Sequence, residues 1–282
     1  MARPTVLRIL LGTQLRKLRE AKGISREQAG ELIRGSDSKI SRMELGRVSF
    51  KERDVADLLT LYGVVDREER TALLALTRQA NEPGWWQRYT DVVWPWVHAY
   101  LGLEQAASLI RIYELQLVTG LLQHEEYTRA LMLSGNLPDA TPEEIERRVA
   151  LRMQRQEMLS RPDPPRLWVV QDEAGLRRPI GGRKVMRLQL EALIESAAKP
   201  NITLQVLPFH VRWHGVIGAF ITLRFPEPEV PDIAYTEQMT SALYLDKQDD
   251  VDRYMAAMDK LTVSCPPPER TPDILRQIIQ ET

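Results

Sequence analysis

The sequence has little cysteine, no long apolar run and no internal repeat. Cys265 is the single cysteine of the 282 residues, which excludes an internal disulfide and a zinc site built from several cysteines. No apolar segment approaches the roughly 18 residues that a membrane span needs. The N-terminal segment MARPTVLRILLGTQLRKL has no signal-peptide cleavage site. We therefore expect a cytoplasmic protein that does not enter the membrane.

The net charge of −1 is divided unevenly along the chain. Residues 1–65 carry 13 Lys and Arg against 8 Asp and Glu, a net charge of +5, which leaves −6 for the remainder. A basic N-terminal part favours a polyanionic partner there, because contacts between cations and phosphates dominate such affinity. A charge of this size also occurs in proteins that bind no nucleic acid, so charge alone leaves both interpretations open.

Helical spacing dominates residues 1–80. Apolar residues recur three and four positions apart at the start of the chain, over about 51–62 and in a helix that begins at Asp66. Two shorter helices are predicted between the first of these and the second, over about 25–33 and 36–45. The sequence therefore predicts an all-α domain over residues 1–80.

The two shorter helices fit a helix-turn-helix. Ser25 and Gln28 form a capping box that opens the first of them. Its predicted buried face consists of Ala29, Leu32 and Ile33. Ser36 caps the second helix, and Ile40 and Met43 point inward from it. This arrangement lets the second helix lie in the major groove of DNA.

The polar residues of this unit are candidates for DNA contacts. Lys39 and Arg42 suit guanine acceptors or phosphates, and Asp37 suits a cytosine amino group. Arg26 and Gln28 would lie beside the DNA backbone. The full predicted set is Arg26, Gln28, Ser36, Asp37, Ser38, Lys39 and Arg42. The same spacing also fits a helical bundle with solvated charges, and it does not separate the two alternatives.

The N-terminal part resembles a known type of helix-turn-helix. LGTQLRKLREAKGISREQAGELI followed by SKISRMELGRVSF is similar to the Cro and phage-repressor type, also called the xenobiotic-response-element type. The matching positions are Ser25, Ile40, Ser41, Arg42, Glu44 and Gly46. The sequence departs from this type at Ala29-Gly30, where Leu-Ala is usual, and at Arg34-Gly35, where Gly and an apolar residue are usual. The resemblance, over about residues 11–63, implies a regulator that reads DNA.

Tryptophan and tyrosine gather after residue 80, in EPGWWQRYTDVVWPWVHAYLGLE. Pro83, Gly84 and Pro95 interrupt this segment, which we interpret as an aromatic-rich entry over 81–103 into a second domain, 81–282. Trp85 and Trp86 are candidates for the wall of a ligand pocket. Core or interface packing is the favoured alternative, because tryptophan buries a large area wherever it packs.

From about residue 108 the pattern mixes strands and helices. Predicted strands are 108–113, 166–172, 201–209, 218–225, 232–238 and 242–246, the last three as an antiparallel meander. Predicted helices are 121–134, 141–160, 183–198, 247–262 and 272–280. The fold class is therefore α+β: an all-α helix-turn-helix domain followed by a larger mixed α/β domain with a small mixed or antiparallel sheet.

This second domain resembles the uncharacterised C-terminal domain of many actinobacterial, Streptomyces-like transcriptional regulators. The similar stretches are GWW, YLGLEQAAS, GLLQHEEYTRAL, RVALRMQRQEMLSRPDPPRLW, DEAGLRRPIGG, MRLQLEAL and PNITLQVLPF. The resemblance implies control of development or antibiotic production, commonly beside a small protein encoded nearby in an antitoxin-like pairing. Glu114, Gln123 and Tyr127 flank the GLLQ turn, either as a docking face or through capping and packing. His124 and Thr119 replace the usual Thr and Pro there.

Metal and catalytic sites have weaker signals. His210 and His214 are spaced like two metal ligands, but no third ligand is apparent. Asp172, Glu173 and Glu237 at predicted strand ends would suit magnesium, although carboxylates there more often cap helices or form salt bridges. We expect no metal, no cofactor and no enzyme activity.

The leading hypothesis is a dimeric regulator that binds double-stranded DNA at a pseudo-palindromic operator with the helix at 36–45 and is controlled by a small protein partner or ligand. One alternative is an antitoxin-like protein that mainly sequesters a small neighbouring protein. The other is a metal-dependent hydrolase in the second domain.

Overall fold

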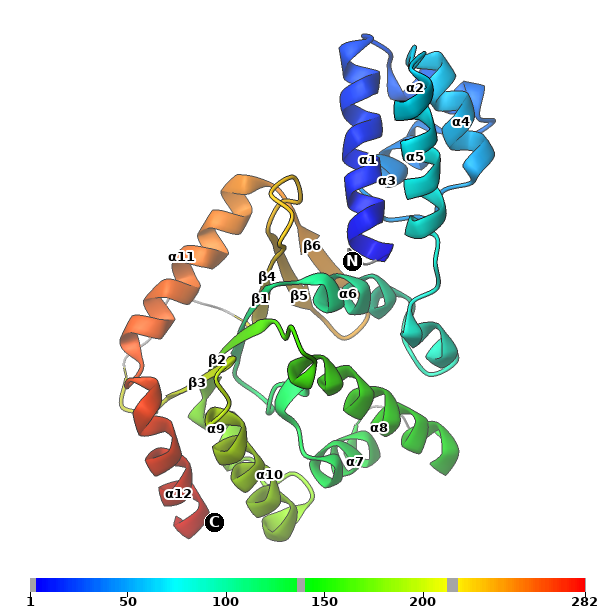
Figure 1. Cartoon of the computed structure of the whole chain (residues 1–282). Coiled ribbons are helices and arrows are strands. Elements are labelled where there is room, and N and C mark those ends of the chain that lie inside the picture. Colours follow the sequence, from blue (N-terminus) through cyan, green and yellow to red (C-terminus); the bar gives the residue numbers. More distant parts are fainter. Residues whose placement is uncertain (1–3, 136–139, 212–217, 282) are drawn as a thin grey trace. The chain divides into compact units, whose positions relative to one another are not determined.

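The computed structural model describes residues 4–135, 140–211 and 218–281 (Figure 1). They form two compact units. Unit 1 comprises the chain up to Arg88 with Val97–Ala106 and Glu227–Val230; unit 2 comprises Tyr89–Trp96, Ala107–Pro226 and the chain from Pro231. Helices and a mixed sheet confirm the α+β class, whereas the domain boundary after residue 80 stays a prediction. No helix of the described residues is long and apolar enough to cross a membrane.

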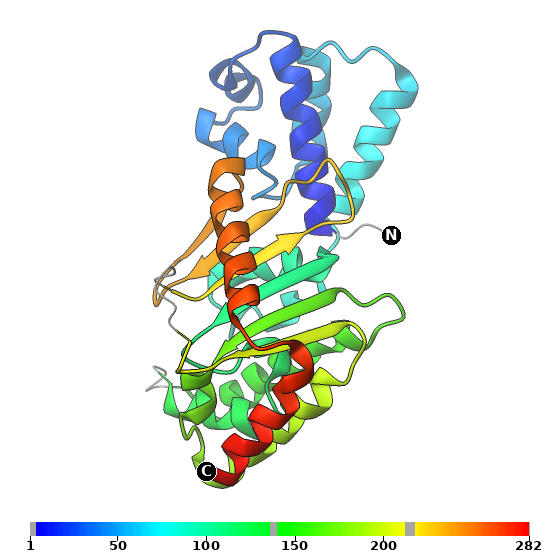
Figure 2. The ribbon, with the colours of Figure 1, turned by 90° about the vertical axis from the view of Figure 1, so that its left-hand side faces the viewer.

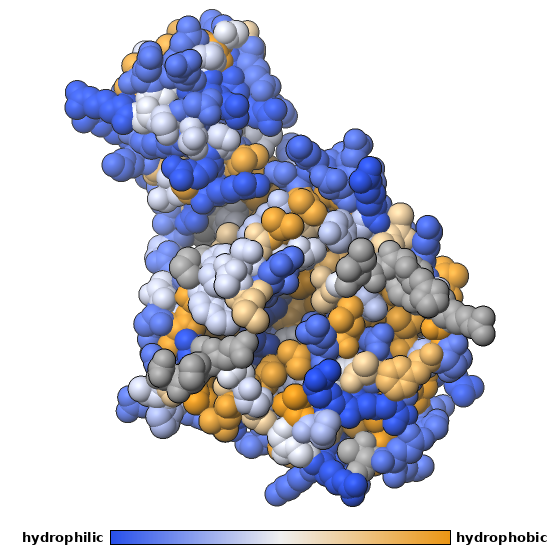
Figure 3. All heavy atoms as spheres, turned by 180° about the vertical axis from the view of Figure 1, so that it is seen from behind, coloured by the Kyte–Doolittle hydropathy of each residue, from blue (hydrophilic) through white to orange (hydrophobic). Residues whose placement is uncertain are grey.

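Unit 1 begins with five helices around one core. They are α1 (Pro4–Ala21), α2 (Arg26–Leu32), α3 (Asp37–Glu44), α4 (Glu52–Leu61) and α5 (Arg67–Ala80). Leu11, Ile40 and Leu58 are among the apolar residues that they bury together. Gly12 lets α1 approach α3, because a Cβ there would lie 2.5 Å from the Met43 carbonyl oxygen. Hydrophilic side chains predominate on the face of these helices seen in Figure 3, as expected for amphipathic helices.

The aromatic-rich segment is more helical than the sequence suggests. A short 3-10 helix, η1, covers Trp85–Tyr89, and α6 covers Pro95–Ala106. The sequence analysis treats Pro95 as an interruption, but proline is favourable in the first turn of a helix, where its missing N–H would have no partner anyway. Pro95 thus begins a helix within the predicted entry segment 81–103 instead of interrupting it.

Unit 2 is built on a six-stranded sheet in the order β3-β2-β1-β4-β5-β6. The strands are β1 (Leu109–Glu114), β2 (Arg166–Asp172), β3 (Ile202–Leu207), β4 (Phe220–Arg224), β5 (Ile233–Glu237) and β6 (Ala242–Leu245). β1, β2 and β3 run parallel, while β4 is antiparallel to β1. The antiparallel pairs β4-β5 and β5-β6 confirm the predicted meander.

Helices cover both faces of this sheet. One face carries α7 (Glu125–Ser134), α8 (Pro142–Gln156) and α10 (Gly182–Ala197), with the short η2 (Gly120–Leu122), η3 (Glu157–Ser160) and α9 (Glu173–Arg177) beside them (Figure 1). Helix α11 (Gln248–Ser264) lies across the other face (Figure 2), and η4 (Pro268–Arg270) leads into α12 (Thr271–Glu281). Tyr113, Val170 and Phe220 pack with Met258 and Leu261 of α11. The central strands are therefore buried on both sides.

Two local predictions are wrong. Leu32 is 46% exposed rather than buried, and Gly30 faces α3 instead, where a Cβ would lie 3.0 Å from the Ser36 carbonyl carbon. The helix predicted from residue 121 begins only at Glu125. His124 caps it, because its Nδ1 accepts the N–H of Glu126 at 3.2 Å. Such a cap satisfies one of the first N–H groups of the helix.

Candidate functional site

Backbone hydrogen bonds close the turn between α2 and α3. Gly35 N–H donates to Gly30 C=O at 2.8 Å, and Arg34 N–H donates to Glu31 C=O at 3.1 Å. These are the paired bonds of a Schellman helix ending. Arg34 has a φ of +52°, in the region where glycine is usual. The unusual Arg34-Gly35 sequence thus places an arginine at the left-handed position of an ordinary turn.

Two predicted DNA-contact residues cap the helices. The Ser36 hydroxyl accepts the N–H of Lys39 at 3.2 Å and begins α3. Gln28 Oε1 accepts the N–H of Ser25 at 2.9 Å, while the Ser25 hydroxyl accepts the N–H of Gln28 at 3.1 Å. The predicted capping box is therefore confirmed. Both caps are exposed, so Ser36 and Gln28 remain accessible from solvent.

Three further predicted residues form ion pairs within the protein. Arg26 Nε lies 3.1 Å from Asp37 Oδ2 and joins α2 to the start of α3. Lys39 Nζ donates to Asp54 Oδ2 of α4 at 2.6 Å, with side-chain exposures of 30% for Lys39 and 13% for Asp54. The second pair is thus partly shielded from solvent and salt. Both pairs hold α3 against neighbouring helices.

Ser38 and Arg42 are the predicted residues that remain unpaired. Both are exposed on α3, and within the part of the chain that the structure describes their side chains have no hydrogen-bond or ionic partner. They are four positions apart, so they lie on one face of the helix. The guanidinium of Arg42 is planar and suits bidentate contact with guanine or phosphate. This face is the strongest candidate for a nucleic-acid interface.

A buried ion pair anchors the end of α3. Arg19 Nε of α1 lies 2.5 Å from Glu44 Oε1, and their side chains are 10% and 6% exposed. Arg19 also donates to the carbonyl of Ile24 at 2.8 Å. The hydrogen bond to Glu44 raises the pKa of Arg19 above its ordinary value. Arg19 is not predictable as the partner of Glu44 from the sequence, because nothing in the spacing pairs residues on separate helices.

Trp85 and Trp86 pack edge to face. Their ring centroids are 6.0 Å apart with an interplanar angle of 89°, and Trp86 is 9% exposed. Further along, Trp94 and Trp96 stack at 5.3 Å. These contacts favour the packing alternative, and a ligand role for the first pair stays a prediction.

The loop after β1 brings Glu114, Gln123 and Tyr127 together. The buried Tyr127 hydroxyl accepts the N–H of Val118 at 3.2 Å, and Gln123 Nε2 donates to the Val118 carbonyl at 2.7 Å. Glu114 accepts the N–H of Leu115 at 3.0 Å, and burial raises the pKa of its carboxyl group. All three side chains bind the main chain of unit 2, which favours packing over a docking face.

Three further glutamines fasten the same loop, and the sequence analysis misses all of them. Each side-chain amide donates to a main-chain carbonyl between residues 117 and 123. The distances are 2.9 Å from Gln171 to Leu117, 2.8 Å from Gln189 to Leu122 and 2.9 Å from Gln156 to Gly120. Gln171 and Gln189 are 1% and 0% exposed. A glutamine within an otherwise apolar stretch, as in LWVVQD and MRLQLEAL, indicates a buried side-chain amide that needs hydrogen-bond partners.

The acidic residues at the strand ends have structural partners. Asp172 Oδ1 accepts the N–H of Ala174 at 2.8 Å and caps α9. Glu173 accepts from Arg177 Nε at 2.6 Å. Glu237 ends β5, which lies three strand spacings from β2, about 14 Å. Glu237 is therefore too far from the other two to share a metal ion with them.

The remaining metal candidates have no more support. His210 is exposed, and His214 lies outside the described residues. In the described ranges, no group of three or more His, Cys, Asp or Glu side chains is arranged to hold a metal ion. Burial raises the pKa of Cys265 to about 12, which keeps its thiol protonated and unreactive. The geometry of the described residues does not favour the hydrolase alternative.

Comparison with known families assigns the larger part of the chain. Residues 97–277 match the model of a domain of unknown function (DUF5753). The chain belongs to this family. Residues 10–73 match a helix-turn-helix domain, and this range contains α2, α3 and α4. No curated protein and no solved structure matches the chain. The DUF5753 chain thus carries the α2-α3 unit of a DNA-binding regulator, as its sequence predicts.

Proposed function

We propose that this DUF5753 protein is a transcriptional regulator that reads double-stranded DNA with α3 in the major groove. The observation that carries the proposal is the side chain of Arg42, which is exposed and unpaired among the described residues. The helix that bears it is held in place by three ion pairs. The helix-turn-helix match and the basic N-terminal charge agree with it. Membership of the Cro and phage-repressor type and an actinobacterial source belong to the same proposal.

The predicted contact residues then have different roles. Ser38 and Arg42 contact base edges, because they alone among the predicted set have free side chains in the described structure. Gln28 and Ser36 cap helices whose first N–H groups face the DNA phosphates. Arg26, Asp37 and Lys39 position α3 through their ion pairs, and Arg26 also adds to the attraction for phosphates.

The proposed regulator is a homodimer in the cytoplasm. Two copies of α3 one helical turn apart match two half-sites, so the operator is pseudo-palindromic. The C-terminal domain responds to a small protein partner or a ligand rather than catalysing a reaction. The antitoxin-like alternative requires a stable complex with the protein encoded next to this one, so absence of a co-purifying complex on co-expression counts against that alternative.

The test begins with selection of bound sites from random double-stranded DNA by the full chain. On the selected site, Arg42→Ala is expected to weaken binding by about 1–3 kcal/mol, the value of one specific base contact. The matched control is Arg67→Ala, which removes another exposed arginine of unit 1, at the start of α5. Both variants are measured at one salt concentration. Unchanged affinity of Arg42→Ala, or an equal loss for both variants, contradicts the assigned face.

A further inference from the structure

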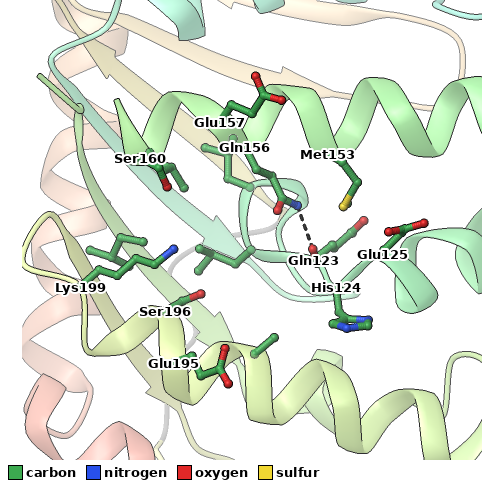
Figure 4. Close-up of a pocket in the computed structure, with 15 residues that line it drawn as sticks. Gln123, His124, Glu125, Met153, Gln156, Glu157, Ser160, Glu195, Ser196 and Lys199 are labelled. Carbon is green, nitrogen blue, oxygen red and sulfur yellow. Dashed lines mark hydrogen bonds between the residues drawn. The ribbon is translucent and has the colours of Figure 1, made fainter. Parts of the chain in front are cut away.

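Unit 2 contains a cavity of about 460 Å³ between the C-terminal ends of α8 and α10 (Figure 4). Leu121, Leu122, Leu159 and Ile202 supply its apolar lining. Its size is in the range of sites for small molecules, which combine an apolar wall with a few polar groups. Neither the DNA-reading face nor the aromatic-rich segment contributes to it.

The floor of the cavity is fixed before any ligand binds. It is the loop that the glutamine side chains fasten to α8 and α10. The Gln156 amide donates to the carbonyls of Gly120 and Gln123, at 2.9 and 2.8 Å. Gln189 donates to the carbonyl of Leu122 and accepts the N–H of His124. A ligand therefore loses little affinity to ordering of this loop.

Lys199, an exposed residue just after α10, supplies the cation at the edge of the cavity. In Figure 4 its ammonium group and the Ser196 hydroxyl point toward the cavity, and the Glu157 carboxylate points away from it, while Glu195 also lines the cavity. The Lys199 ammonium has no partner among the residues that the structure describes. The third lining carboxylate, Glu125, forms an ion pair with Arg129 at 2.7 Å. A free ammonium and a hydroxyl beside an apolar wall suit a carboxylate with an apolar body.

We propose that this cavity binds a small carboxylic acid, with its carboxylate on Lys199 and Ser196 and its apolar body on the leucine-rich wall. The carboxylate would gain a charge-assisted hydrogen bond to Lys199 and a second hydrogen bond to Ser196. The apolar body would leave water for the surface formed by Leu121, Leu122 and Ile202. The acid is recognised by both parts, so an amine or an alcohol of the same carbon skeleton binds less well.

Helix α8 connects this site to the segment that precedes α6. Its C-terminal end lines the cavity through Gln156. In its N-terminal half, Arg147 pairs with Asp91 at 2.7 Å, and Arg148 donates to the carbonyl of Val92 at 3.1 Å. Any movement of α8 that accompanies acid binding would change the contacts of residues 89–96, the segment between Met1–Arg88 and Val97–Ala106 of unit 1. That this change alters DNA binding rests on the proposed function; the binding of the acid does not.

The first experiment measures binding by calorimetry of the full chain with octanoate and phenylacetate. Octylamine, octanol, phenethylamine and phenethyl alcohol are the matched probes. The acids are expected to bind more tightly than their amines and alcohols, and Lys199→Gln to weaken acid binding about tenfold or more. Lys184→Gln, an exposed lysine at the start of α10 that does not line the cavity, is the control and keeps full affinity.

A third variant tests the place of binding. Ala192→Leu puts a larger side chain into the cavity wall and is expected to abolish acid binding, while thermal unfolding shows that the protein remains folded. No heat with either acid overturns the proposal. Equal affinity for acid and amine, an equal loss in the two lysine variants, or acid binding that survives Ala192→Leu also overturns it.

The second experiment measures affinity for the selected DNA site with and without the acid. The acid is expected to change this affinity in the native chain, and Asp91→Asn is expected to keep acid binding but lose the change. An acid that binds without changing DNA affinity overturns the coupling through α8 and supports the site alone. A chain that binds the acid but no DNA contradicts the proposed function and leaves the acid site supported.

Discussion

Helix α3 and the loop between β1 and α7 are both held by polar side chains, but the chemistry differs. Glu44, Asp37 and Lys39 of α3 form ion pairs with three separate helices. The loop is held mainly by side-chain amides, from Gln123, Gln156, Gln171 and Gln189. The first region uses charge, and the second uses neutral hydrogen bonds.

The difference follows from what surrounds each region. An amide satisfies a buried carbonyl without the desolvation of a full charge, so it suits a loop beneath three helices. A helix that binds phosphates needs cations at its surface. In and around α3, the carboxylates of Glu44, Asp37 and Asp54 pair with cations and hold them in place. Charge therefore positions the proposed reading helix, while amides build the floor of the proposed ligand site.

The largest expected effect tests the charged side of this comparison. Glu44→Gln removes the nearer counter-charge of the buried Arg19 guanidinium and leaves only Glu20 Oε1 at 3.5 Å, so we expect a loss of about 3 kcal/mol in the free energy of unfolding by urea. The double variant Arg19→Met, Glu44→Leu removes both charges and is expected to recover most of the loss. If Glu44→Gln is as stable as the native protein, the ion pair does not anchor α3.

The amide side is expected to give a smaller loss. Gln189→Leu leaves the Leu122 carbonyl and the His124 N–H without their partner, at a cost of about 2 kcal/mol. Gln277→Leu is the control, because Gln277 is exposed on α12 and donates only to Glu281. Urea unfolding of both variants checks the difference. Equal stability of the two would mean that the loop does not depend on the buried amide.

Local sequence patterns predicted most of the elements in both regions. The Ser25 capping box predicted the start of α2, and the helix predicted from Thr141 corresponds to α8, which Thr141 caps. Alternating apolar residues predicted β1, and the apolar run after a proline-rich stretch predicted β2, so the fold class followed from the order of the elements. The positions of Ile40 and Met43 in the core were also predicted correctly.

Long-range partners were not predictable from such patterns. Arg19 and Glu44 are on different helices. Gln171 and Leu117 come together only because β2 pairs with β1 in the sheet. Arg26 and Lys39 are predicted to contact DNA, but each forms an ion pair within the protein, with Asp37 and Asp54. These partners, too, are not predictable from local spacing. Arg42 was identified by its outward position alone, but only the three-dimensional contacts separate it from the paired residues around it.

The turn before α3 allows a finer test of how that helix is positioned. Arg34→Gly is expected to stabilise the protein by about 1 kcal/mol, because glycine adopts the positive φ of this position without strain. Arg34→Ala is the matched control and is expected to give no such gain, since alanine has the same Cβ clash. The two free energies of unfolding are compared directly. A gain for alanine equal to that for glycine would assign the effect to the charge rather than to the backbone.

The smallest expected effect is on the pH dependence of stability, and it comes from Glu114, the carboxylate that lies beside the glutamines of the loop. Burial raises the pKa of Glu114 above its ordinary value of 4.5, although the backbone N–H groups of Gln116, Leu115 and Leu117 oppose this shift. The folded protein therefore holds this proton more tightly than the unfolded chain does. This contribution to stability is full below pH 4.5 and declines as the pH rises from there to the raised pKa. Glu114→Gln is expected to remove the decline and to increase stability at neutral pH, as urea unfolding across this pH range would show.

The exposed Glu143 of α8 provides the matched control for Glu114. Glu143→Gln makes the same change of side chain at an exposed position and controls for the substitution itself. Parallel curves for Glu114→Gln and the native protein would mean that Glu114 is solvated well enough to ionise freely. The loop would then tolerate a charge as α3 does, and the contrast between the two regions would rest on the buried glutamines alone.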